Sequence, residues 1–296
     1  MSGGQVAHRP RRSVLYMPAS NERALEKAKN LPVDGLILDL EDAVAPDAKE
    51  QARENACAAA RSGEYGRREV TIRVNGSGTQ WHDADLAAAC AAGPDGIVVP
   101  KVGSADEVRA LVAAMEAAGA PEHTKLWAMV ETPQAMLHCE EIAGASERLT
   151  VLVMGTNDLA KELHAEHVPG RQPLLTGLGL CLLAARATGT VILDGVYNDV
   201  KDAPGFEAEC LQGRQMGFDG KTLIHPGQVE ACNAAFAPSE AQVEEAHGVL
   251  RAWEDGAGAG VVTYRGRMVE NLHVETARRV LETHEAIAAL EADARG

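Results

Sequence analysis

Two acidic residues, Glu131 and Asp158, have the type and the surroundings that a divalent metal site needs, because each follows a short apolar run, in the segments VETP and GTNDL. Two carboxylates brought together without a cation repel each other, and a hard divalent ion relieves that repulsion. Mg²⁺ typically binds one or two protein carboxylates and fills its other positions with water and substrate oxygens. The sequence therefore predicts that Glu131 and Asp158 bind Mg²⁺, or Mn²⁺ in its place. The alternative is two unrelated carboxylates that only support other ligands.

Arg73, in the segment IRVNG, is the strongest candidate for binding an anion. Its planar guanidinium presents a fixed fork of donors that suits a substrate carboxylate or a developing enolate oxygen. A structural salt bridge to Glu41 or Asp42 is the alternative, and the two roles are compatible. We predict Arg73, Glu41 and Asp42 as catalytic residues.

Four basic residues near the first and fourth apolar runs could bind a phosphate-bearing substrate tail: Arg12, Arg23, Lys27 and Lys101. Surface lysines and arginines are common, so solvated side chains are the alternative. From this set we predict Arg12 and Lys101 as substrate-binding residues.

The histidines give weaker signals. His164 and His167 form an H-x-x-H pair, but no further histidine or cysteine stands at a spacing suited to zinc, so we expect a loop surface there. His225, in LIHP, is expected to orient a loop or contact a ligand. The chain has no serine nucleophile elbow and no cysteine with a poised histidine.

Eight short apolar and β-branched runs must position these residues, and stretches rich in Ala, Glu, Leu, Lys and Arg separate them. The runs are SVLYMP from Ser13, GLILDLED from Gly35, VTIRVNG from Val70, GIVVPKV from Gly96, KLWAMVETP from Lys125, TVLVMGTNDL from Thr150, TVILDGVYND from Thr190 and GKTLIHP from Gly220. Strand followed by helix, repeated eight times, predicts parallel pairing with right-handed crossovers. Eight units in about 225 residues match a closed (β/α)8 barrel, with a doubly wound open sheet as the alternative.

Polar residues gather where these runs end. Each run begins apolar, as a strand buried on both faces does, and most close on a charged or hydrogen-bonding group. These groups are Glu41, Asp42, Arg73, Asn75, Lys101, Glu131, Asp158, Asp194, Asp199 and His225. The carboxyl ends of barrel strands meet at one mouth, where active sites of this fold lie.

The pattern changes after the eighth run. We predict a flexible arm over residues 1–10, the barrel over residues 11–236 and a C-terminal helical extension over residues 237–296. The extension is expected to contain helices over 239–253 and 274–292, joined by a glycine-rich hinge and the short run VVTYRGRMVE.

Composition restricts the partners and the compartment. With 43 acidic and 28 basic residues the formal charge is −15, which opposes binding to nucleic acid. No apolar run approaches the roughly 20 residues that a membrane helix needs. The six cysteines form no C-x-x-C pair, and this pattern favours a reducing cytoplasm.

Several segments in order, RSVLYMPASN, LDLEDAVAPDAK, IRVNG, GIVVPKV, VETPQAM, GTNDLAKEL, LDGVYNDVKDAPGF and MGFDGKTLIHPGQV, resemble the family of the citrate lyase beta subunit and of malyl-CoA and citramalyl-CoA lyases. The likeness covers about residues 12–281. It implies a barrel of the phosphoenolpyruvate/pyruvate-binding type with a C-terminal helical lid. It also implies cleavage of a 3-hydroxy-carboxyacyl-CoA thioester into acetyl-CoA and a 2-oxo acid.

The resemblance assigns roles that agree with the reasoning above. Glu131 and Asp158 match the Mg²⁺ ligands, and Arg73 matches the arginine that faces the reacting oxygens. Backbone N–H groups of Gly155, Thr156 and Asn157 are expected to hold the substrate carboxylate.

The lid segment departs from the family. The stretch from Met268, MVENLHVETARRVL, is similar to a segment that closes over a neighbouring subunit's site, which implies a homotrimer or homohexamer. Glu270 stands where the family has an aspartate proposed as an acid or base, and the longer side chain shifts the carboxylate by about 1 Å. We predict Glu270 as a catalytic residue, and the departure favours hydrolysis of a malyl-CoA-like thioester as an alternative activity.

Two further alternatives come from related proteins. One is a citrate lyase beta-type subunit that needs an acyl-carrier partner, which the lid argues against. The other is the class of barrel aldolases that act on free hydroxy-keto acids, which usually has D-G-E-H where this chain has Asp39-Leu40-Glu41-Asp42. No histidine stands at position 42, which favours the coenzyme A branch.

Overall fold

The computed structural model of the protein describes residues 9–256 and 260–293. Residues 1–8 of the predicted arm and residues 257–259 of the predicted hinge lie outside these ranges. The chain divides into two compact units, a barrel unit of Arg11–Phe236 and a C-terminal unit that includes Ala237–Gly296.

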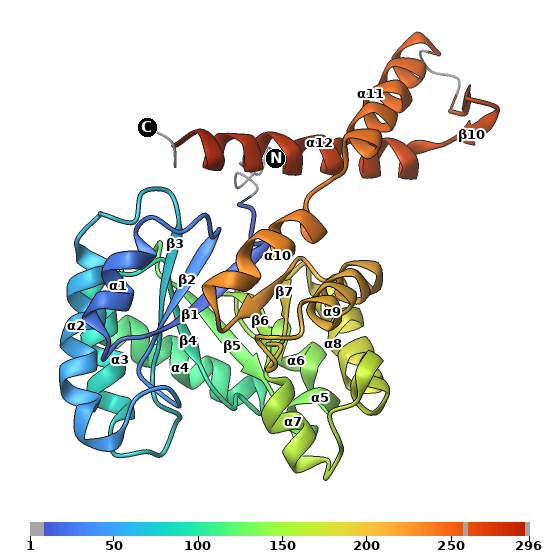
Figure 1. The fold of residues 1–296 in the computed structure, drawn as a ribbon. Helices are drawn as coiled ribbons and strands as arrows, with labels where there is room; N and C mark the ends of the chain where they lie inside the picture. The colour runs from blue at the N-terminus through green and yellow to red at the C-terminus, as the bar shows by residue number, and fades with distance from the viewer. Residues whose placement is uncertain (1–8, 257–259, 294–296) are drawn as a thin grey trace. The chain divides into compact units, whose positions relative to one another are not determined.

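Within the described ranges, eight parallel strands close into a barrel in the order of the sequence (Figure 1). β1 pairs with β2 on one side and with β8 on the other, so the barrel has no edge strand. The strands are β1 (Ser13–Pro18), β2 (Gly35–Asp39), β3 (Glu69–Arg73), β4 (Gly96–Val99), β5 (Lys125–Val130), β6 (Leu149–Met154), β7 (Val191–Asp194) and β8 (Gly220–Leu223). The prediction of a (β/α)8 barrel is confirmed, and the open-sheet alternative is wrong because β8 returns to β1.

Helices surround the strands and connect each one to the next (Figure 1). They are α1 (Glu22–Ala28), η1 (Pro46–Ala48), α2 (Lys49–Arg61), α3 (His82–Ala92), α4 (Ala105–Ala117), α5 (Pro133–Leu137), α6 (Cys139–Ala143), α7 (Thr156–Glu162), η2 (Pro169–Leu174), α8 (Leu175–Thr188), α9 (Ala203–Met216), η3 (Pro226–Gln228) and α10 (Val229–Phe236). Local sequence fixes several starts. Asn21, Ser104 and Asp202 each accept a hydrogen bond from the backbone N–H three residues later, which satisfies a donor that the helix leaves free.

Successive strand residues face alternately the barrel interior and the helix layer, so both faces of the sheet are buried. An apolar cluster fills the interior with Val14, Ile37, Val98, Trp127, Met129, Val151, Val153 and Leu193. Trp127 needs a glycine opposite it, because a Cβ at Gly96 would lie 2.8 Å from the indole Nε1. The interior is therefore a packed core.

The C-terminal unit contains α11 (Glu240–Asp255), a hairpin of β9 (Val262–Tyr264) and β10 (Arg267–Val269), and α12 (Asn271–Asp293). The predicted C-terminal helices are confirmed. The hairpin was expected only as a short apolar run. Arg265 and Gly266 form its two-residue turn, both with positive φ of 47° and 75°, as tight hairpin turns require. The unit has a core of its own, made of Ala246, Val249, Val269, Val274 and Ala277.

In the described part of the chain no helix is long and apolar enough to cross a membrane. All six cysteines are free thiols and buried.

Candidate active site

Glu131 and Asp158 lie at the carboxyl ends of adjacent strands, as expected from the sequence. Glu131 follows β5 directly, and Asp158 belongs to the first turn of α7, which follows β6. Gly155 joins the two segments, since its N–H donates to the carbonyl of Val130 at 3.1 Å. A Cβ at Gly155 would lie 2.1 Å from Glu131 Oε2, so the Glu131 carboxyl occupies room that only glycine leaves at this position.

The Glu131 carboxyl is almost fully buried, with 2% of the residue exposed. Its Oε1 accepts a hydrogen bond of 2.8 Å from the backbone N–H of Lys101. Lys101 adopts φ of 55°, a left-handed conformation that is costly for a lysine and that gives this N–H its direction. Burial raises the pKa of Glu131 to about 7, and Lys101 opposes the rise while the charge of Asp158 adds to it.

A positive charge already lies among the carboxylates at this end. The ammonium of Lys101 is 3.7 Å from Asp158 Oδ1 and 3.6 Å from Glu41 Oε1. No group of three or more His, Cys, Asp or Glu side chains that could hold a metal occurs among the described residues. The protein therefore offers two carboxylates, Glu131 and Asp158, with water and substrate left to complete a coordination sphere, and this donor set fits Mg²⁺.

Arg73 ends β3 with its guanidinium inside the barrel. Asp39 binds it through two parallel hydrogen bonds, Nε to Oδ1 at 2.6 Å and Nη2 to Oδ2 at 2.7 Å. The remaining nitrogen, Nη1, lies 2.8 Å from Glu41 Oε2. Tyr16 covers one face of the guanidinium, with 4.8 Å from Cζ to the ring centroid. Although burial disfavours its charge, Asp39 outweighs that cost and keeps the pKa of Arg73 well above its ordinary value.

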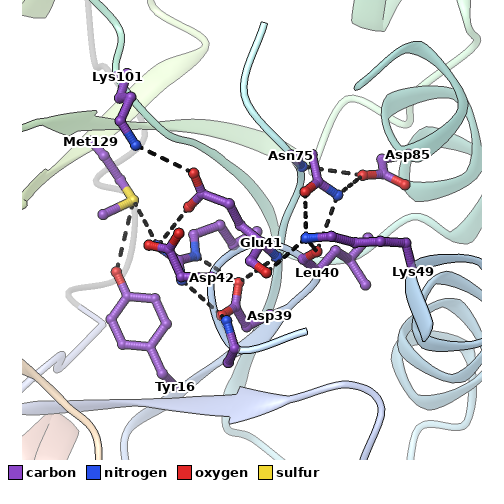
Figure 2. Close-up of polar contacts among 12 residues, drawn as sticks. Tyr16, Asp39, Leu40, Glu41, Asp42, Lys49, Asn75, Asp85, Lys101 and Met129 are labelled. Atoms are coloured by element: carbon purple, nitrogen blue, oxygen red, sulfur yellow. Dashed lines mark hydrogen bonds and ion pairs between the residues drawn. The ribbon is translucent and has the colours of Figure 1, made fainter. Parts of the chain in front are cut away.

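Asp39 is a site residue that the sequence analysis missed, since it named Glu41 and Asp42 as the possible partners of Arg73. The register of the barrel pairs Asp39 with Arg73 directly across β2 and β3. Two neighbouring predicted strands that end on opposite charges could have predicted this ion pair. Figure 2 shows Asp39 beside Glu41 and Asp42 at the end of β2.

A second missed residue, Lys49, holds the loop that carries Glu41. Its buried ammonium donates to the carbonyls of Leu40 and Glu41, each at 2.8 Å, and to Asn75 Oδ1 at 2.7 Å (Figure 2). Burial lowers the pKa of Lys49, and the neighbouring carboxylate Asp39 opposes that change. For the acid Glu41 burial has the opposite effect and raises the pKa, while the positive charge of Arg73 opposes that rise.

Other predicted residues reach the same end of the barrel with weaker contacts. The Asp42 side chain is 68% exposed and lies 3.7 Å from Arg73 Nη1. The segment that starts α7, Gly155, Thr156 and Asn157, lies beside the carboxylates of Glu131 and Asp158. Asn157 is exposed and exchanges two side-chain hydrogen bonds with Asn198, at 3.1 and 2.7 Å.

Arg12 is not brought to this site. It precedes β1, at the amino end of the barrel, and its buried guanidinium binds Asp34 through Nε and Nη2, both at 2.9 Å. The expectation that Arg12 binds a substrate tail therefore has no geometric basis, because the length of the strands separates it from Glu131. Asp194 also points away from the mouth, since it pairs with Arg171 and Lys221 in the helix layer.

Two further predicted residues have local contacts of their own. The His225 ring accepts a hydrogen bond of 3.0 Å from the N–H of Gly227 and so orients the loop after β8. Glu270 belongs to the C-terminal unit, immediately before α12, where its backbone N–H donates to His273 Nδ1 at 3.0 Å.

Most of the barrel unit matches a known family model. The model described as HpcH/HpaI aldolase/citrate lyase matches residues 12–226. The chain belongs to this family. A second model, described as C-C_Bond_Lyase of the TIM-Barrel fold, matches residues 178–287.

Full-length relatives support the assignment to the HpcH/HpaI aldolase/citrate lyase family. A protein named (3S)-malyl-CoA thioesterase from Cereibacter sphaeroides (strain KD131) is 52% identical over 97% of this chain and 100% of its own length. The citrate lyase subunit beta of Escherichia coli (strain K12) is 35% identical over 94% of each chain. The CitE protein of Mycobacterium tuberculosis, solved in complex with magnesium, acetoacetate and coenzyme A, is 29% identical with a TM-score of 0.75 over 92% of this chain and 97% of that chain.

These likenesses confirm the predicted membership of the citrate lyase beta and malyl-CoA family. The chain is an enzyme of a carbon–carbon lyase family. Mg²⁺ and coenzyme A, the predicted cofactor and acyl carrier, are ligands of this family, as the CitE complex shows.

Proposed function

We propose that this enzyme acts, with Mg²⁺, on a 3-hydroxy-carboxyacyl-CoA of the malyl-CoA type and cleaves it to acetyl-CoA and a 2-oxo acid. The observation that supports this most is the meeting of a carboxylate pair and a buried, bidentately held arginine at one end of the barrel. A Lewis-acid site next to a fixed cation is what a cleavage through an enolate requires. The malyl-CoA and coenzyme A of the named relatives agree with this substrate class.

In this proposal Glu131 and Asp158 hold the metal, and the N–H groups of Thr156 and Asn157 hold the substrate carboxylate. Gly155 does not take part as was expected, because its N–H already donates to the carbonyl of Val130. When bound, Mg²⁺ supplies Lewis-acid polarisation of the substrate's hydroxyl and carboxylate oxygens. Lys101 fixes Glu131 through its backbone N–H and lies near Asp158 through its ammonium, where it would also meet an anionic substrate.

Residues of the chain would move the protons. Glu41 takes the proton of the substrate hydroxyl, whose electron pair forms the new carbonyl of the oxo acid as the carbon–carbon bond breaks. The electrons of that bond pass to the acetyl-CoA enolate, and Arg73 Nη1 donates to the oxygen that becomes negative. Glu270, through the predicted closure of the C-terminal unit over a neighbouring subunit, returns a proton to the enolate carbon.

Hydrolysis of the thioester is the second candidate, and a specific observation favours it. The relative with 52% identity over 97% of this chain is named a (3S)-malyl-CoA thioesterase. The same residues can serve, because Glu41 would deprotonate a water molecule that attacks the thioester carbonyl while the coenzyme A thiolate leaves and takes up a proton. The two candidates share the substrate and differ in the bond that breaks.

The deciding experiment is incubation of the purified chain with (3S)-malyl-CoA and Mg²⁺ in H₂¹⁸O, followed by mass spectrometry. Cleavage gives acetyl-CoA and glyoxylate, whereas hydrolysis gives free coenzyme A and malate with one ¹⁸O in its carboxylate. Citramalyl-CoA and citryl-CoA, and acetyl-CoA with pyruvate, glyoxylate or oxaloacetate in the reverse direction, define the substrate. EDTA should stop either reaction, and turnover of none of these compounds would reject the proposed substrate class.

The predicted assembly and compartment belong to the same proposal. A homotrimer or homohexamer, measured by size-exclusion chromatography with light scattering, would allow exchange of the C-terminal unit between subunits. Activity of the purified chain on coenzyme A thioesters alone would exclude the carrier-dependent alternative that its 35% identity to citrate lyase subunit beta leaves open. Six buried free thiols are consistent with the predicted reducing cytoplasm.

A further inference from the structure

We infer that Asp39 is the positioning residue of the site, which holds Arg73 so that Nη1 faces the reacting oxygens and sets the place of Glu41 at the same time. This inference rests on the proposed function for its catalytic consequence. Its structural part, the dependence of Arg73 and Glu41 on one carboxylate, does not.

The geometry of Asp39 supports both tasks. Its two oxygens bind Nε and Nη2 of Arg73 at 2.6 and 2.7 Å, and Asp39 is fully buried. Two parallel bonds of this kind fix the plane of a guanidinium as well as its position. The ring of Tyr16 lies on one face of that plane, so rotation out of it would break a third contact. Nη1 is left on the side of Glu41.

The same carboxylate also shapes the loop after β2. Asp39 Oδ1 accepts from the N–H of Glu41 at 2.9 Å, and Oδ2 accepts from the N–H of Ala43 at 3.1 Å. Asp39 therefore has four donors on its two oxygens, two from Arg73 and two from the loop. One side chain thus sets the 2.8 Å separation between Arg73 Nη1 and Glu41 Oε2.

The chain offers a matched control at the other end of the barrel. Asp34 binds Nε and Nη2 of Arg12 at 2.9 Å each and also accepts from the backbone N–H of Arg12 at 2.8 Å. Both aspartates are at most 1% exposed, and both arginines at most 7%. The two pairs match in type and burial, so a purely structural role predicts similar consequences when either aspartate becomes an amide.

The experiment compares Asp39→Asn with Asp34→Asn in the full chain. Both variants should lose thermal stability to a similar degree. Asp39→Asn should lower kcat for the malyl-CoA reaction about 100-fold, because a misplaced donor and base cost that much, while Asp34→Asn stays within about threefold of the wild type. Parallel losses of kcat and Tm in the two variants, or a wild-type kcat in Asp39→Asn, would overturn the inference.

A double-mutant cycle separates positioning from direct action. If Asp39 works partly through Arg73, Asp39→Asn should cost clearly less than about 100-fold once Arg73→Lys is in place, and the cost that remains is the misplacement of Glu41. Full additivity of the two losses contradicts the inference. Should Asp39→Asn not fold, Asp39→Glu takes its place, since it keeps the charge and moves the carboxylate by one methylene.

A spectroscopic measurement is independent of turnover. The Nε–H signal of Arg73 in a ¹⁵N spectrum, assigned by its loss in Arg73→Lys, should shift and exchange faster with solvent in Asp39→Asn and stay unchanged in Asp34→Asn. An unchanged signal in Asp39→Asn would refute the inference even if the enzyme is active. A changed signal in a chain that turns over none of the thioesters would keep the positioning and reject the proposed function.

Discussion

The two ends of the barrel contain the same kinds of charged residue in different balance. At the amino end, Arg11 binds Glu69 at 2.5 and 2.8 Å and Arg12 binds Asp34 at 2.9 Å, so each cation has its carboxylate. The Arg11 guanidinium also covers Trp127 at 5.5 Å. Both arginines at this end are therefore compensated, and Arg11 covers the packed interior.

The carboxyl end contains more acids than bases. Among the described residues of the network around Arg73, Lys49 and Lys101, the carboxylates are Asp39, Glu41, Asp42, Asp85, Glu131 and Asp158, and the cations are Lys49, Arg53, Arg73 and Lys101. The excess of two negative charges equals the charge of one divalent cation. Buried charges are costly unless they are compensated, so the imbalance indicates that this end is completed by a ligand and the amino end is not.

The largest expected effect comes from replacing one carboxylate at each end. Glu131→Gln should lower Mg²⁺-dependent turnover at least 1,000-fold, because it removes a proposed metal ligand. Glu69→Gln should reduce Tm and leave kcat within about threefold, because it only breaks a pair at the closed end. Steady-state kinetics at saturating Mg²⁺ and calorimetric Tm values test both. Substantial activity of Glu131→Gln would move the metal site elsewhere.

Within the carboxyl end, two adjacent acids should differ. Glu41→Gln should lower kcat about 100-fold, because Glu41 is the proposed base and lies 2.8 Å from Arg73. Asp42→Asn should stay within about twofold, since its side chain is 68% exposed and 3.7 Å from the same nitrogen. Equal losses in the two variants would mean that the general negative potential matters and that a positioned base does not.

Periodicity and strand-end polarity were enough to predict the barrel and the place of Glu131, Asp158 and Arg73. In each case the signal is local, because a charged residue follows an apolar run. Lys101 was expected to bind a substrate tail. Its backbone N–H donates to Glu131 because Lys101 has a left-handed φ, and a lysine in the sequence does not predict that conformation.

Residues whose roles depend on register were missed or misplaced. Asp39 pairs with Arg73 because β2 and β3 align these positions, and the alignment follows from closure of the whole barrel. Arg12 has the composition expected of a site residue, yet it precedes its strand and therefore lies at the opposite end. The deciding property is which end of a strand a charged residue occupies. Arg12 stands directly before the first apolar run, so its place at the amino end could have been predicted from the sequence.

The imbalance between the ends also predicts how stability depends on pH in the metal-free protein. Burial raises the pKa of Glu131 from 4.5 to about 7. Below pH 4.5 the group is protonated in both states. Between pH 4.5 and 7 the folded state keeps a proton that the unfolded state has lost, so raising the pH favours unfolding.

This loss should reach about 3 kcal/mol above pH 7. Urea unfolding of EDTA-treated protein at pH 4.5 and 8 measures it. Glu131→Gln should remove this contribution and Glu69→Gln should retain it. Equal pH dependence in the wild type and both variants would show that burial does not raise the pKa of Glu131 in the metal-free protein.

The smallest expected effect concerns Lys101, the cation that partly offsets the excess charge. Its ammonium lies 3.7 Å from Asp158 and its side chain is 44% exposed, so its repulsion of a metal ion is screened. Lys101→Met should therefore tighten Mn²⁺ binding about fivefold in calorimetric titration, whereas Lys101→Arg, which keeps the charge, should not.

Lys101→Gly completes this comparison, because glycine adopts the left-handed backbone without cost and retains the N–H that binds Glu131. It should share the tighter metal binding of Lys101→Met and have a higher Tm than that variant. If all three variants bind Mn²⁺ as the wild type does, the ammonium does not compete with the ion. The excess of negative charge at the carboxyl end would then have to be compensated by the metal alone.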